Sequence, residues 1–187
     1  MPADPGQPPL TSTPATAAVA KSSTQYVGFV LADQEYAFRI DHIREIVIPE
    51  RVTRLPQVAS YVEGCSNLRG TIIPMINLRV LLGLEAKPRD AQTRTIVAQV
   101  GKKIVGCTVD DVTQVLRISS DQIQSASTVL GTGQASYISG LAKVDSRLII
   151  LLEIEQLLDI SNLEHIHQLA LEDGHSRLSG TSTTENK

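Results

Sequence analysis

The chain has no tryptophan, only two cysteines and few aromatic side chains, which make up 3% of its 187 residues. So few aromatic faces argue against a groove that stacks single-stranded nucleic acid or sugars. The charge is nearly balanced, with a formal net charge of −3, so the chain lacks the basic excess with which proteins bind polyanions. We therefore expect no nucleic-acid partner.

Long hydrophobic runs and secretion signals are also lacking. No stretch approaches the ~18 apolar residues that a membrane-spanning helix needs, and the N-terminus has neither the basic nor the apolar part of a signal peptide. Cys65 and Cys107 stand far apart in strand-like sequence, which favours small buried thiols. We expect a cytoplasmic protein without direct membrane insertion.

Motifs of catalysis and of metal or cofactor binding are missing as well. None of the four histidines stands in an HExxH pattern. Asp110 and Asp111 are adjacent, so on a strand they would point to opposite faces, which fits a turn at a strand end better than a general acid/base pair. No Ser/His/Asp arrangement or dinucleotide-binding glycine motif is present. We expect a binding protein that is not an enzyme and holds no metal or other cofactor.

Composition divides the chain into a core and two ends. Residues 1–24 are rich in Pro, Ala, Ser and Thr, which predicts a disordered tail. Residues 25–160 predict a folded domain. An amphipathic pattern from Glu153 to Gly174 predicts one or two helices, so residues 161–187 are expected to form a helical extension and a flexible tail.

The core reads mainly as short strands separated by turns, which favours a β-barrel or sandwich. Hairpins are predicted around Gly101-Lys102-Lys103 and around Asp145-Ser146. In TIIPMINL (71–78), Pro74 favours an edge or bulge position.

Helical signals are short in this core. Asp41 is expected to cap a helical turn through HIREI (42–46). Asn77 is expected to cap a second turn through LRVLL (78–82), which Gly83 then ends.

An internal repeat relates the two halves of the core. Residues 62–82 align without a gap with residues 138–158, and the alignment places Gly64 on Gly140. Upstream, residues 26–31 align with residues 95–100. The repeat predicts two related β subdomains of about 70 residues each, with a groove where they join.

The repeat also singles out two charged residues. Glu45 aligns with Gln114, and Arg69 aligns with Asp145, so the β framework itself requires neither charge. Arg69 lies in the turn NLRG, where its forked guanidinium suits a partner contact. The alternative is a surface ion pair between Arg69 and Glu45, which would contribute little stability.

The chain resembles the CheW family of chemotaxis coupling proteins in three segments: QYVGFVLADQEYAFRIDHIREI, VTRLP and YVEGCSNLRGTIIPMINLR. The family has a similar FxLxxxxYxxxIxxIxEI stretch before a GxxNLRGxIxPxxDLR stretch. The resemblance continues to YISGLAKVDSRLIILLEIEQLL and covers about residues 25–160.

The resemblance implies two SH3-like five-stranded β-barrels that share a core, with short helices and a C-terminal helix. It implies a non-catalytic adaptor that binds the cytoplasmic tips of methyl-accepting chemotaxis receptors and the regulatory domain of the histidine kinase CheA. It leaves open whether the pathway is flagellar or another chemosensory type. The alternative from a different class is that the SH3-like fold implied by the resemblance serves as a module that binds a small ligand or nucleic acid.

Site residues follow from the resemblance residue by residue. Glu45 and Arg69 match positions that the family associates with its kinase and receptor contacts. The chain departs from the family at Arg39, where Asp is frequent, and at Asn77, which replaces the DLR aspartate. Four further residues match the region near the inter-barrel groove implicated in receptor docking: Ile43, Ile46, Gly64 and Gly140.

Overall fold

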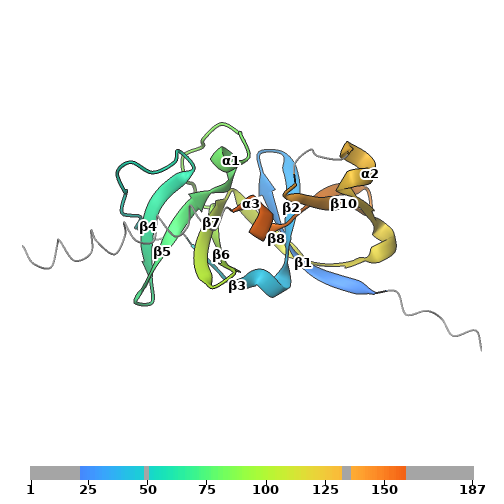
Figure 1. The fold of residues 1–187 in the computed structure, drawn as a ribbon, viewed down its shortest axis with the longest axis horizontal. Helices are drawn as coiled ribbons and strands as arrows, with labels where there is room; N and C mark the ends of the chain where they lie inside the picture. Colours follow the sequence, from blue (N-terminus) through green and yellow to red (C-terminus); the bar gives the residue numbers. More distant parts are fainter. Residues whose placement is uncertain (1–21, 49–50, 132–135, 159–187) are drawn as a thin grey trace, which may run out of the picture.

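The structure is a computed structural model that describes residues 22–48, 51–131 and 136–158. In this part of the chain most residues lie in short strands of two sheets, which stand side by side in Figure 1. The mainly β fold predicted from the sequence is confirmed. No helix in these residues is long and apolar enough to cross a membrane.

One sheet has six strands in the described residues. Five strands are expected for each barrel, and the short strand β9 is the additional one in this sheet. The sheet lies on the right of Figure 1. In hydrogen-bonded order its strands are β8 (Asp111–Ser119), β1 (Ser23–Leu31), β2 (Gln34–Arg39), β11 (Arg147–Leu152), β10 (Ile138–Val144) and β9 (Ile123–Ser125).

The other sheet has five strands in the described residues. Thr53 makes a single bridge to Cys65 at the place that corresponds to β9. In hydrogen-bonded order the strands are β3 (Ile43–Val47), β6 (Arg94–Val100), β7 (Lys103–Val109), β5 (Thr71–Asn77) and β4 (Val62–Leu68).

Each sheet combines strands from both copies of the repeat. In the six-stranded sheet, β1 and β2 of the first copy pair with β8 and β11 of the second. In the five-stranded sheet, β6 and β7 of the second copy pair with β3 and β5 of the first. The two predicted β subdomains are present, and each is built from strands of both copies rather than from one half of the chain. The β5–β7 and β2–β11 pairs are parallel, and a parallel pair needs a crossover between its strands.

The repeat itself is confirmed down to single residues. The β4–β5 register shifts between Val62 and Gly64, and the β10–β11 register shifts at the equivalent place before Gly140. Both glycines are buried. A Cβ atom on Gly64 would overlap the carbonyl oxygen of Thr53, and one on Gly140 would lie 2.6 Å from the carbonyl oxygen of Gln124. The repeated glycines thus mark two bulges where another backbone segment crosses closely.

The predicted turns and the second short helix are confirmed. The β6–β7 turn begins at Gly101, and the β10–β11 turn holds Asp145 with φ at +54°. Asn77 caps α1 (Leu78–Leu81) by accepting a hydrogen bond from the Val80 amide at 3.3 Å. Gly83 follows this helix with φ at +77°. The other helices in the described residues are α2 (Ala126–Leu130), α3 (Ile154–Leu157) and the 3-10 turns η1 (Ile40–His42) and η2 (Ser120–Gln122).

The expected helical turn through HIREI is wrong. Only η1 is helical, and its N-cap position is Arg39, whose side chain pairs with Asp41 at 2.7 Å. The residues that follow form β3, which pairs with β6. Because β-branched side chains suit a pleated strand, pairing with a neighbouring strand outweighs the short helical pattern here.

Pro74 does not lie on an edge strand or at a bulge, contrary to the expectation. It lies in β5, which is an inner strand, and it faces Cys65 of β4. The parallel ladder to β7 begins one residue later, at Met75. The missing N–H of the proline therefore falls outside that ladder.

The predicted ends of the folded domain lie partly within the described residues. β1 begins at Ser23, which pairs with Ser119, so the ordered chain starts before the predicted boundary at residue 25. Within the stretch predicted to be helical, the described residues form the short helix α3, which ends at Leu157 and is followed by an extended Leu158. Residues 1–21 and 159–187, which hold most of the predicted tail and extension, lie outside the described residues.

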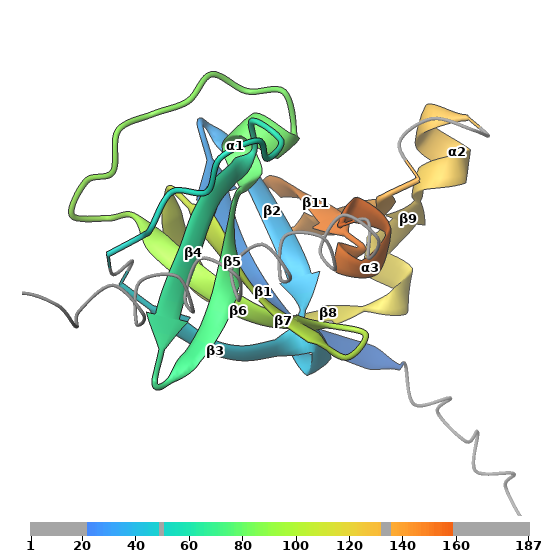
Figure 2. The ribbon, with the colours of Figure 1, turned by 60° about the vertical axis from the view of Figure 1, so that its left-hand side comes forward.

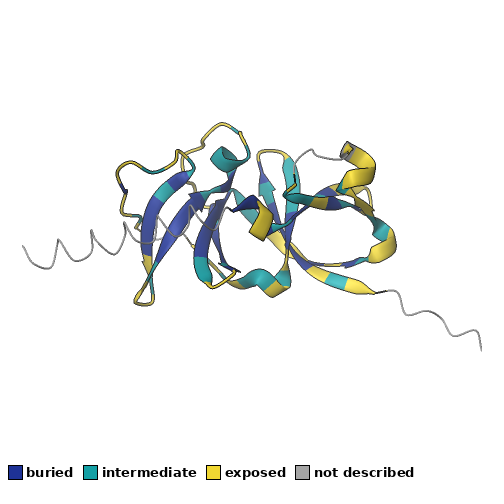
Figure 3. Cartoon of the chain, viewed as in Figure 1, coloured by how far each residue is buried: buried dark blue, intermediate teal, exposed yellow. Residues whose placement is uncertain are grey.

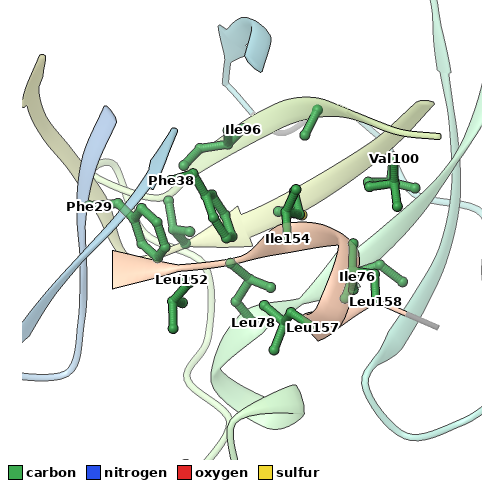
Figure 4. Close-up of a cluster of buried hydrophobic side chains, with 14 of the residues drawn as sticks. Phe29, Phe38, Ile76, Leu78, Ile96, Val100, Leu152, Ile154, Leu157 and Leu158 are labelled. Carbon is green, nitrogen blue, oxygen red and sulfur yellow. The ribbon is translucent and has the colours of Figure 1, made fainter. Parts of the chain in front are cut away.

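The largest hydrophobic cluster lies between the two sheets and joins them. Phe29 and Phe38 lie in it with ring centroids 4.9 Å apart, and Figure 4 shows them near the apolar side chains of β5, β6 and α3. Smaller clusters lie within each sheet, around Ile149 in one and Ile73 in the other. Figure 2 shows β1 and β2 crossing behind the five-stranded sheet, and Figure 3 shows the buried strand segments between exposed loops.

Candidate partner-binding surface

Strand β3 presents apolar side chains at an open edge of the five-stranded sheet. In the described part of the chain β3 pairs with β6 and with no other strand. Ile46 is 41% exposed, and Ile48, just beyond the strand, is 70% exposed. Single exposed apolar residues are ordinary, but two on one open edge are typical of a place where another protein binds.

The two charged residues singled out in the sequence meet beside this edge. Arg69, in the β4–β5 turn, donates from Nη2 to Oε2 of Glu45 in β3 at 2.8 Å. The side chain of Arg69 is 79% exposed and that of Glu45 is 28% exposed. The ion-pair interpretation is thus confirmed, while partner contact stays a prediction. We call Ile46, Ile48, Glu45 and Arg69 together the β3 surface.

The backbone at Arg69 is unusual for an arginine. Its φ is +49°, in the left-handed region that glycine and asparagine adopt most readily. Asp145 occupies the equivalent turn of the other copy, with φ at +54°. Asn67 accepts a hydrogen bond from the Gly70 amide at 2.7 Å and so supports the turn. Since the turn forms with Asp in the other copy, its geometry gives no reason for an arginine at position 69.

The remaining predicted residues do not gather at one place. Ile43 packs against the central cluster, whereas Ile46 faces outward. Gly64 and Gly140 are buried in different sheets, where the crossing backbone explains the absence of a side chain. The structure therefore brings Glu45 and Arg69 together, whereas Ile46, the next residue of β3, lies on the opposite face of the strand.

Sequence reasoning missed Ile48 and a second exposed edge. Val115, the repeat counterpart of Ile46, is 54% exposed on β8, which forms the edge of the six-stranded sheet. The residue before it is Gln114, the counterpart of Glu45. Extending the repeat alignment to exposed apolar positions would have found this edge. The protein thus has two equivalent edges with different charges.

A polar contact between Arg79 and Asp110 was also missed. Both side chains are 15% exposed and form an ion pair. Asp110 also accepts a hydrogen bond from the Ala32 amide at 2.8 Å, and Arg79 donates to the Glu85 carbonyl at 2.8 Å. The interpretation of Asp110 as a residue at a strand end is correct, but its role is larger: it ties the β1–β2 turn of one sheet to α1 beside the other.

The described residues hold neither a cluster of metal-ligating side chains nor an activated thiol. They hold no group of three or more His, Cys, Asp or Glu side chains placed to bind a metal ion. Burial raises the pKa of Cys107 to about 12 and that of Cys65 to about 11, so neither thiol is an activated nucleophile. What the β3 surface presents is apolar area and one ion pair.

Comparison with known proteins agrees with this description. The model of the CheW-like domain matches residues 25–162. The chemotaxis protein CheW of Helicobacter pylori is 36% identical over 134 residues, which cover 72% of this chain and 81% of the relative. The CheW of Thermotoga maritima is 35% identical over 144 residues, 77% of this chain and 93% of the relative.

A solved structure shows the same fold. The scaffolding protein TtCheW from Thermoanaerobacter tengcongensis matches with a TM-score of 0.67 and 26% identity, over 75% of this chain and 96% of that chain. CheW proteins form a family of non-catalytic scaffolds and adaptors with two SH3-like subdomains, which is how the two sheets are arranged here. This chain belongs to the CheW family and is a chemotaxis adaptor.

Proposed function

We propose that this adaptor works in the cytoplasm, where it binds the tips of methyl-accepting chemoreceptors and the regulatory domain of the histidine kinase CheA. The observation that carries the proposal is the β3 surface, an open edge strand that exposes Ile46 and Ile48 and carries the Glu45–Arg69 ion pair on the face opposite Ile46. Apolar area framed by charge is typical of a transient protein interface.

The charged pair supplies selectivity in this proposal. An exposed ion pair contributes little to folding, so Glu45 and Arg69 are free to exchange their mutual contact for charges on a partner. A matching charge favours the correct partner, and a like charge disfavours a wrong one. The uncharged counterpart, Gln114, would make the β8 edge select a different partner.

Two edges on one rigid body suit a coupling protein. The central cluster joins both sheets, so partners on β3 and β8 would be held at a fixed mutual orientation. A receptor state that favours one kinase arrangement would then shift the kinase equilibrium by the difference in binding free energy. The adaptor needs no chemistry of its own.

The test is co-sedimentation of the purified protein with receptor-tip fragments and with the CheA regulatory domain. We expect both complexes to form, and we expect Arg69→Ala and Glu45→Ala each to weaken at least one of them by about tenfold, the loss of roughly one charged contact.

The matched control is Arg39→Ala, because Arg39 also forms an exposed ion pair, with Asp41 at 2.7 Å, but on β2 of the other sheet. This variant should bind like the unmodified protein. Failure of either complex to form would contradict the proposed function. If Arg69→Ala and Glu45→Ala both bound like the unmodified protein, only the assignment of the binding site would be contradicted.

A further inference from the structure

A second surface shares no residue with the β3 surface. The segment 51–60 and the start of β4 enclose an open cleft of about 770 Å³. Its apolar floor, as we name it here, is made of the lining residues Leu55, Val58 and Val62; Val58 is partly buried, and Leu55 and Val62 are buried in the central cluster. Three arginines line it as well, Arg51, Arg54 and Arg89.

The charges in the cleft do not balance. Glu63 is the one carboxylate among the described lining residues. It accepts hydrogen bonds from Arg89 at 2.8 Å and from Thr108 at 2.6 Å, so its negative charge is paired with Arg89 rather than with Arg51 or Arg54. The guanidinium groups of Arg51 and Arg54 have no hydrogen-bond or ion-pair partner among the described residues. The cleft therefore combines an apolar floor with unpaired positive charge, which suits an acidic amphipathic segment.

The described chain ends beside this floor. Leu157 and Leu158 belong to the same hydrophobic cluster as Leu55 and Val62. Figure 4 shows both leucines close to Ile76, and Ile76 pairs with Val62 across the β4–β5 ladder. A segment that continues from Leu158 therefore starts one strand away from the cleft.

Segment 159–187 has the composition that the cleft requires. It holds five acidic and two basic side chains, and its amphipathic pattern places Leu163, Ile166 and Leu169 on one side, with Glu172 and Asp173 following. A helix over residues 159–172, at about 1.5 Å per residue, would place Glu172 about 20 Å beyond Leu158. Most of the segment lies beyond residue 162, where the match to the family model ends.

We propose that segment 159–187 docks into this cleft, with its apolar side on Leu55 and Val58 and with Glu172 and Asp173 on Arg51 and Arg54. The covalent link favours the chain's own segment over a separate partner, because a short tether gives an effective concentration in the millimolar range. This inference goes beyond the proposed adaptor function and does not depend on it.

The test places a nitroxide spin label on the full chain through Gln168→Cys and measures paramagnetic broadening of the backbone amide signals. The native thiols are buried, so the introduced cysteine is the one that reacts. We expect strong broadening at Val58 and Ala59. Arg51→Glu with Arg54→Glu should reduce the docked population by about tenfold, since two attractive pairs become repulsive.

Matched variants complete the test. Glu172→Arg with Asp173→Arg, combined with the two arginine reversals, should restore the broadening. Reversal of two exposed charges on the other sheet, Arg117→Glu with Lys143→Glu, should leave it unchanged. The proposal is overturned if Val58 and Ala59 show no broadening or if the arginine reversals have no effect. Broadening that arises only between labelled and unlabelled molecules in a mixture also overturns it, because a second copy would then be the occupant.

Discussion

Gly64 occupies a position where the backbone leaves no room for a side chain. Its φ is +134°, and a Cβ atom would overlap the carbonyl oxygen of Thr53. We expect Gly64→Ala to lower the free energy of unfolding by about 3 kcal/mol, because steric overlap adds to backbone strain. Urea denaturation monitored by circular dichroism measures this change.

Gly70 provides the control for this prediction. Its φ is also positive, at +90°, but nothing lies within 4 Å of the position that a Cβ atom would take. Gly70→Ala should therefore cost only the backbone strain, about 1 kcal/mol. Equal losses at the two positions would show that the crossing Thr53 backbone is not the cause.

Arg69 allows binding to be separated from folding. Arg69→Asn removes an exposed ion pair, worth less than about 1 kcal/mol, and places a residue better suited to φ at +49° in the turn. We expect unfolding free energy to stay within about 1 kcal/mol of the unmodified value, while partner binding falls. Asp145→Asn, in the equivalent turn, should change neither. A large loss of stability on Arg69→Asn would make the residue structural.

The two cysteines should be inert in the folded protein. Because burial raises their pKa to about 11 and about 12, roughly a thousandth or less of either thiol is ionised at pH 8. We expect Ellman's reagent to label neither cysteine within minutes in buffer and both in 8 M urea. Rapid labelling without urea would show that one thiol is accessible.

At the scale of elements, the Arg79–Asp110 pair joins α1 to the β1–β2 turn. Both side chains are mostly buried, and Asp110 would keep its charge without a counter-ion in Arg79→Ala. We expect this variant to lose about 3 kcal/mol of unfolding free energy. Arg39→Ala breaks an ion pair whose side chains are 47% and 55% exposed, and it should lose less than about 1 kcal/mol. Similar losses would argue against the linking role of Arg79.

At the scale of the whole molecule, the exchange of strands makes the two copies interdependent. Fragment 1–88 contains β1 and β2 but lacks β8 and β11, with which they pair. We expect fragments 1–88 and 89–187 each to be unfolded alone, because each would expose its half of the central cluster, and to regain β structure when mixed. Circular dichroism of the separate and mixed fragments tests this. Cooperative unfolding of either fragment alone would contradict it.

Local patterns predicted those elements whose causes are local. The hairpin at Gly101, the cap at Asn77 and the end of α1 at Gly83 depend on residues a few positions apart, so the sequence sufficed. The prediction failed at HIREI and at Pro74, where the decisive partners were β6 and β7. Strand pairing across a long sequence distance is not readable from a short window.

The sequence by itself determined the β class and the internal duplication, because the alternation of apolar residues, the turn residues and the repeated glycines can be identified from the sequence alone. It also offered the Glu45–Arg69 ion pair as one of two interpretations of these residues. Only the tertiary structure decided that each sheet takes strands from both copies and that Ile46 and Ile48 share an open edge. It also placed Arg51 and Arg54 over an apolar floor. These features depend on which distant segments pack together, and the burial of the shared core sets that arrangement.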